Sequence, residues 1–101
     1  MTTEQTACWI FLATAVASEN DAAEVASISS AADMINHAVP TQEELQTSLA
    51  WLTEKGIILQ EGNAYRLTPK GKADYKQASK KTTRMSRIWE NLENIVKKYN
   101  T

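Results

Sequence analysis

The chain is poor in the residue types that build covalent and metal sites. Its single cysteine, Cys8, allows no internal disulfide, and together with the single histidine, His37, it is too small a ligand set for a zinc site. The three glycines form no phosphate-binding loop, and no nucleophile, base and acid stand in a catalytic constellation. We therefore expect no enzyme activity, no cofactor and no metal, with a buried inert thiol at Cys8 and a turn position for His37.

Long apolar runs are missing too. The longest mainly apolar stretch, residues 7–17, is about half the length of ~20 residues that a bilayer span needs. Glu4 is the only charged side chain before it, so no positive segment of the signal-peptide type precedes it. We therefore expect a cytoplasmic protein without membrane contact. Trp9, Leu12 and Val16 lie at helical spacing, and the lack of a polar face predicts a scaffold helix buried on several sides.

Positive charge is nearly absent from the first half of the chain. Residues 1–55 hold eight acids and one cation, residues 56–101 hold four acids and ten cations, and the net charge is −1. Eight of the cations fall between Arg66 and Arg87, opposed there by Asp74 alone. Such asymmetry indicates a nucleic-acid face, or complementary surfaces that meet in an oligomer. The sequence favours neither of two interpretations of this cationic run, one as a contact with a DNA backbone and the other as a solvated or partner-facing patch.

A second helix is predicted by apolar residues at helical spacing, namely Val25, Ile28, Ala32 and Ile35. Its start has two interpretations. Asp21 with Glu24 could form a capping box for a helix from residue 22, or residues 23–26 could form a brief strand before a shorter helix capped by Ser27. We favour the shorter helix. Asn36 tolerates the left-handed conformation and is expected to close it.

Residues 41–68 carry the clearest local signals. Thr41 and Glu44 fit the T-x-x-E capping box, a leucine stripe follows at i, i+4 and i+7, and Gly56 supplies a left-handed stop, which together predict a helix at 42–55. Two strands, 57–60 and 64–67, are predicted around a tight turn. Thr68 and Pro69 then form the cap and first position of another helix.

Three segments resemble known proteins. LAWLTEKGII at residues 49–58 resembles the L-x-x-L-x-x-K-G-[LI]-[IV] signature of winged helix-turn-helix proteins, and YRLTPKG at 65–71 is similar to the Y-x-L-T-x-x-G after the wing of MarR- and PadR-type regulators. Residues 33–41 resemble a turn in a small group of uncharacterised bacterial winged-helix proteins. The resemblance implies a mostly α fold with a small β-hairpin wing. In the family's usual docking, the helix at 42–55 enters the major groove and the hairpin touches the DNA backbone or minor groove.

The resemblance also implies site residues. The expected base readers are Gln42, Gln46 and Thr47, with Ala50 as a further candidate. The expected phosphate contacts are Arg66 in the wing and Lys70, Lys72 and Lys76 after it. One departure from the family pattern is that Glu43, Glu44 and Glu54 lie on the docking helix itself. Contacts to the DNA phosphates would therefore have to come from the later cations.

The C-terminal segment is predicted to be helical from Pro69 almost to Tyr99, with a weak point at Thr82 and Thr83. Its later part has a stripe at coiled-coil spacing that we expect to pair two subunits: Met85, Ile88, Trp89, Leu92, Ile95 and Tyr99. The alternative is that this helix folds back onto its own domain. We thus expect a winged helix-turn-helix at residues 1–81 and an extended dimerisation helix at 82–101, within one compact unit.

The function expected from these features is a homodimeric DNA-binding transcriptional regulator that binds double-stranded DNA. The alternative is a winged-helix interaction module whose acidic helix contacts a protein instead of DNA. Trp9, Trp51 and Trp89 could line an effector cavity, but packing in cores and interfaces is the commoner use of tryptophan, so a small-molecule effector is possible without support from the sequence.

Overall fold

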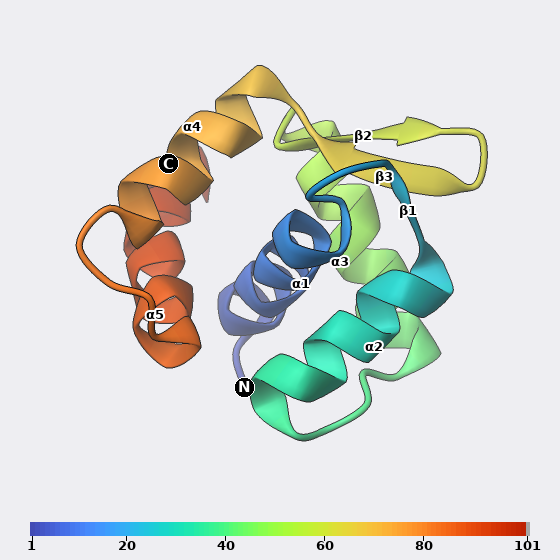
Figure 1. The fold of residues 1–101 in the computed structure, drawn as a ribbon, viewed down its shortest axis with the longest axis horizontal. Helices are drawn as coiled ribbons and strands as arrows, with labels where there is room; N and C mark the ends of the chain where they lie inside the picture. Colours follow the sequence, from blue (N-terminus) through green and yellow to red (C-terminus); the bar gives the residue numbers. More distant parts are fainter. Residues whose placement is uncertain (101) are drawn as a thin grey trace.

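The computed structural model describes the backbone of residues 1–100 and the side chains of residues 1–99 (Figure 1). It is mostly helical with one small antiparallel sheet. The elements are α1 (Thr3–Ala17), β1 (Ala23–Glu24), α2 (Val25–Asn36), α3 (Gln42–Glu54), β2 (Ile58–Glu61), β3 (Ala64–Leu67), α4 (Pro69–Ser79), α5 (Met85–Val96) and the 3-10 helix η1 (Lys97–Asn100). The strand order is β1-β3-β2. Within the described residues, each helix is too short or too polar to cross a membrane.

Helix α1 is the centre of the molecule, and α2, α3 and α5 pack around it. Every residue from 7 to 15 is buried, which confirms the scaffold helix predicted there. Its start is set locally, because Thr2 accepts a hydrogen bond from the Gln5 amide while the Gln5 side chain accepts one from the Thr2 amide. The buried Trp9 indole donates to the carbonyl of Ala32 at 2.9 Å, so α1 and α2 are joined by a polar contact as well as by apolar packing.

Helix α2 differs from both predicted starts. A strand is present but covers only Ala23–Glu24, and the helix begins directly after it at Val25, with no side-chain cap. The strand pairs with β3, and this pairing fixes the backbone just before the helix, which therefore starts without a cap at Ser27. The predicted stop was also one residue early. His37, not Asn36, adopts the left-handed conformation (φ 54°), while its amide still forms a helical i→i−4 hydrogen bond to the Asp33 carbonyl at 2.6 Å.

The predicted helix and hairpin at 41–68 are confirmed, with the helix ending one residue early, at Glu54, and the first strand starting and ending one residue later than predicted. Thr41 and Glu44 form the reciprocal capping box: the Glu44 amide donates to Thr41 Oγ1 at 3.0 Å, and the Thr41 amide donates to Glu44 Oε1 at 2.8 Å. Gly56 follows with φ 76°. Glu61 pairs with Ala64, so the hairpin turns over two residues.

Helix α4 approaches the start of β2 very closely. Thr68 caps the helix by accepting from the Gly71 amide, and its hydroxyl donates back to the Gly56 carbonyl at 2.5 Å. A Cβ atom added to Gly71 would lie 2.0 Å from the Ile57 carbonyl oxygen. The glycine of the Y-x-L-T-x-x-G pattern is therefore required for packing, because any side chain would push the helix away.

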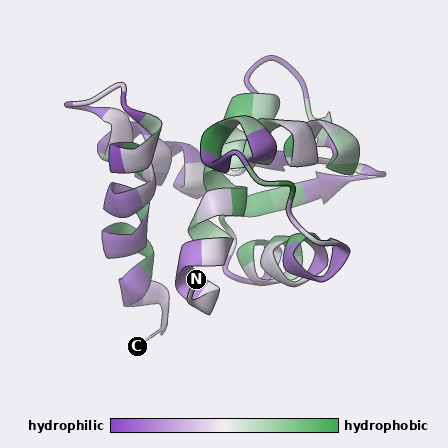
Figure 2. Cartoon of the chain, turned by 90° about the horizontal axis from the view of Figure 1, so that it is seen from below, coloured by the Kyte–Doolittle hydropathy of each residue, from purple (hydrophilic) through white to green (hydrophobic). Residues whose placement is uncertain are grey.

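The extended C-terminal helix is not formed. The chain breaks at residues 80–84, which include the predicted weak point, and α5 turns back to pack against α1 and α4. Figure 2 shows the hydrophobic side of these C-terminal helices facing the rest of the molecule and the hydrophilic side facing outward. The apolar stripe therefore has a partner within its own chain.

Candidate interaction surface of helix α3

Helix α3 presents a row of four exposed residues on the side opposite its buried stripe. Since successive residues of an α-helix are about 100° apart, this row is formed by Glu43, Thr47, Ala50 and Glu54. Neither Glu43 nor Glu54 forms a hydrogen bond or an ion pair within the described part of the chain. The centre of the exposed face is thus acidic and has small side chains between the two carboxylates.

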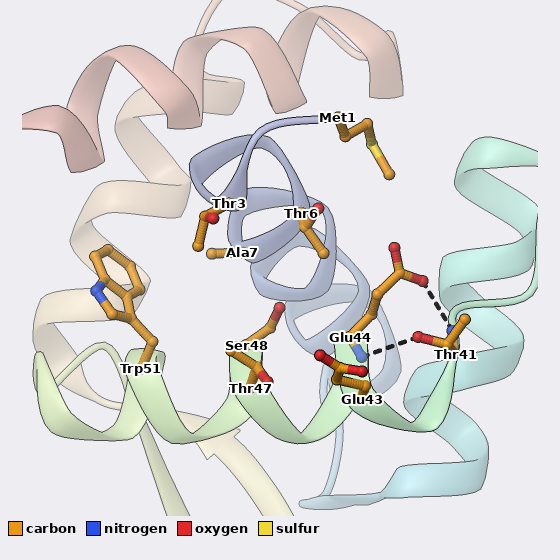
Figure 3. Close-up of a pocket in the computed structure, with 10 residues that line it drawn as sticks. All are labelled: Met1, Thr3, Thr6, Ala7, Thr41, Glu43, Glu44, Thr47, Ser48 and Trp51. Carbon is orange, nitrogen blue, oxygen red and sulfur yellow. Dashed lines mark hydrogen bonds between the residues drawn. The ribbon is translucent and has the colours of Figure 1, made fainter.

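A groove of about 420 Å³ runs beside this row, where the N-terminal end of α1 meets α3 (Figure 3). Its apolar surface includes Met1, Ala7 and Trp51, and its rim includes Glu43 and Glu44. The Glu44 carboxylate is already held in the capping box, whereas Glu43 is not. The Trp51 ring is half-buried, with Lys55 Nζ 6.0 Å from its centroid. A cation of the same chain therefore already lies near this ring.

The expected base readers do not share one surface. Gln42 and Gln46 line a hollow on the hairpin side of α3, together with Gln60 and Tyr65. Thr47 lies on the other side and lines the groove against α1. All three expected readers are exposed, but the acidic row separates the glutamines from the groove.

Two of the four expected phosphate contacts are engaged within the chain. Arg66 Nε lies 2.8 Å from the Glu61 carboxylate at the tip of the hairpin. Lys70 Nζ donates to the Lys55 carbonyl at 3.0 Å and lies 4.1 Å from the centroid of the Tyr99 ring. The wing and the start of α4 therefore offer less free positive charge than the sequence indicates.

The other two, Lys72 and Lys76, lie on the outward side of α4. Lys80 continues their row by one further turn, and Gly71, Asp74 and Ala78 form the buried side of the same helix. No carboxylate lies within ion-pair distance of these three lysines in the described part of the chain. We call Lys72, Lys76 and Lys80 the lysine row.

The residues expected at a dimer interface contribute to the chain's own packing. Ile88 and Leu92 are buried, Ile95 is half-buried, and Met85 is 38% exposed. The Trp89 ring stacks on Trp9 at 6.1 Å between centroids, and its indole donates to the Gln5 carbonyl at 2.9 Å. Little of this stripe remains for a second subunit, and association through it stays a prediction.

Tyr99, the last residue of that stripe, donates from its hydroxyl to the buried Asp74 carboxylate at 2.5 Å. Burial, followed by this hydrogen bond and the negative charge of Asp74, raises the pKa of Tyr99 to about 12. Cys8 is fully buried in α1, and burial raises the pKa of its thiol to about 12, so it lacks the thiolate that redox or nucleophilic chemistry needs.

The described residues contain no group of three or more histidine, cysteine, aspartate or glutamate side chains that could hold a metal ion. Of the three tryptophans that the sequence offered as cavity residues, Trp51 alone lines this groove, whereas Trp9 and Trp89 stack on each other. The sequence interpretation missed the N-terminal residues Met1 and Thr3, whose place beside α3 depends on how α1 crosses that helix. Comparison with protein-family models, curated proteins and solved structures finds no match.

Proposed function

We propose that this chain is a winged-helix interaction module that binds protein through the outward face of α3. The observation that carries the proposal is the pair of exposed, unpaired carboxylates at Glu43 and Glu54, next to a groove that contains Trp51. The winged-helix assignment is supported by the order of α1, β1, α2, α3 and the β2–β3 hairpin, with the sheet order β1-β3-β2.

Electrostatics favours protein over DNA on this face. Phosphate contacts from lysine and arginine supply most of the non-specific affinity of DNA-binding proteins. Carboxylates at the centre of a docking helix would instead repel the phosphates, and both Arg66 and Lys70 have intramolecular partners. Protein partners have no such requirement: a tryptophan beside a polar, charged rim is typical of binding hot spots. A cationic apolar segment fits this face best.

The second candidate is the homodimeric DNA-binding transcriptional regulator. Exposed Gln42, Gln46 and Thr47 favour it, because glutamine can pair with adenine and threonine with several base edges. The free cations on α4 would supply its phosphate contacts.

Titrations followed by NMR test the two candidates on the full chain. The probes are a synthetic amphipathic helix of leucine and lysine and a mixed-sequence DNA duplex. We expect the peptide to shift the Trp51 indole signal, assigned with Trp51→Phe, and the backbone amides of α3, while the duplex leaves both in place.

The double variant Glu43→Gln/Glu54→Gln should weaken peptide binding at least tenfold. The control Glu19→Gln/Asp21→Asn changes net charge equally in an exposed loop away from α3 and should bind as the natural chain does. If instead the duplex shifts the α3 signals with a steep salt dependence and the peptide does not, the regulator is correct and the interaction module is wrong.

A further inference from the structure

The lysine row, on α4 and its C-cap Lys80, forms no ion pair within the described part of the chain, although Lys72 lines a hollow together with Glu19 and Asp21. Lys72, Lys76 and Lys80 are one helical turn apart on an exposed face, and no acid of the described residues pairs with them. Like charges at i and i+4 destabilise a helix by about 0.2–0.5 kcal/mol for each pair. A partner that carries negative charge would remove this repulsion.

We infer that the partner of the acidic α3 face is the lysine row of a second copy of this chain. The inference rests on the function proposed above and names its partner. The same molecule carries both surfaces, and their charges are opposite: Glu43 and Glu54 are free carboxylates on α3, and the lysine row is free on α4. Neither surface has an ion-pair partner among the described residues of its own chain.

The lysine row is somewhat shorter than the distance between the two carboxylates of α3. Glu43 and Glu54 are separated along α3 by about 16 Å, and Lys72 and Lys80 along α4 by about 12 Å, at a rise of 1.5 Å per residue. The residues between the two carboxylates of α3 are small, namely Thr47 and Ala50, and the long side chain of Lys76 lies between Lys72 and Lys80. Packed helices lie about 8–10 Å apart between axes, depending on the side chains at their contact, and the lysine side chains of α4 require the upper end of this range. The lysines can then reach the carboxylates at both ends of α3.

The groove supplies the apolar part of this contact. Lysine side chains bury their methylene stems on apolar surface while their ammonium groups stay near water. The rim of the groove is acidic at Glu43 and its surface contains the Trp51 ring, so it accommodates such a stem and attracts its cation. The contact joins two different surfaces. It gives a symmetric dimer only when each copy uses both of its surfaces, and otherwise the oligomers become longer as the protein concentration rises.

Charge reversal tests the inference by sedimentation equilibrium of the full chain at several protein concentrations. One variant carries Glu43→Lys and Glu54→Lys, and the other carries Lys72→Glu, Lys76→Glu and Lys80→Glu. All five positions are exposed, so both variants should keep the natural circular dichroism spectrum. We expect the natural chain to self-associate, each variant alone to associate at least tenfold more weakly, and an equimolar mixture of the two to regain association.

The control Glu24→Lys/Asp33→Lys makes the same change of charge as the first variant, but at exposed positions outside α3 and outside the lysine row, and should leave association unchanged. A natural chain that stays monomeric while the leucine–lysine peptide still binds α3 overturns the inference and leaves the proposed function standing. A natural chain that neither self-associates nor binds the peptide overturns both the inference and the proposed function. Reversal of the lysine row that abolishes duplex binding without changing the sedimentation would assign the row to DNA, and the inference would be wrong.

Discussion

Replacing Gly71 by alanine tests how closely α4 approaches β2. Helix propensity alone predicts stabilisation, since alanine is favoured over glycine inside a helix by about 1 kcal/mol. The tertiary structure predicts the opposite, because the new Cβ would lie 2.0 Å from the Ile57 carbonyl oxygen. Relief of this clash must move α4 or the Ile57 carbonyl, which accepts from the Thr68 amide at 3.0 Å and lies 3.1 Å from the Thr68 hydroxyl.

The expected magnitude follows from these opposing effects. Overpacking costs about 1–3 kcal/mol, and weakening a hydrogen bond to the Ile57 carbonyl costs about 1 kcal/mol. Set against the propensity gain, the free energy of unfolding should fall by about 2 kcal/mol. In a chain of this size, each kcal/mol lowers the melting temperature by about 4–8 °C.

Urea denaturation followed by circular dichroism measures this change. Ala73→Gly is the matched control, because residue 73 is exposed on the same helix and its substitution should cost only the propensity difference of about 1 kcal/mol. A Gly71→Ala chain that is as stable as the natural one, or more stable, would refute the close approach of α4 to Ile57.

Two further predictions concern the C-terminal helices. Leu92→Ala should lower the free energy of unfolding by about 2–5 kcal/mol, because Leu92 is fully buried in its own chain. The loss should be equal at low and high protein concentration, whereas a loss that grows with concentration would place Leu92 in an interface between subunits. Tyr99→Phe should cost about 1–3 kcal/mol at pH 7, since the buried Asp74 carboxylate loses its hydrogen-bond donor. The pKa of Tyr99 is raised from 10.0 to about 12, so the folded chain binds the proton more tightly than the unfolded one, and this part of the stability is present below pH 10 and lost as the pH rises towards 12. Urea midpoints of the natural and Tyr99→Phe chains should therefore converge above pH 10, and a constant difference between them would contradict the role of this proton.

The sequence alone determined the elements whose chemistry is local. The capping box of Thr41 and Glu44, the stop at Gly56 and the cap at Thr68 all join groups only a few residues apart. Such contacts form wherever the segment is placed, so their patterns predicted the central helix and the hairpin to within a residue or two. Where the signal was weaker, at the start of α2, pairing of β1 with β3 set the boundary instead.

Only the tertiary structure determined which segments pack against the apolar stripe and which groups pair with the exposed cations. The apolar stripe of α5 predicts that one face of this helix is buried, but heptad spacing cannot distinguish burial against a second subunit from burial against α1 and α4. The turn at residues 80–84 allows α5 to pack against α1 and α4 of its own chain. Arg66 and Lys70 are cations in any fold, yet only the folded chain brings them to the Glu61 carboxylate and the Lys55 carbonyl. Helical periodicity places Glu43 and Glu54 on one face, while the packing of α3 on α1 turns that face to the solvent beside Trp51. Hydrogen bonds within a turn depend on neighbours in the sequence, whereas burial and ion pairing depend on which distant segments the fold brings together.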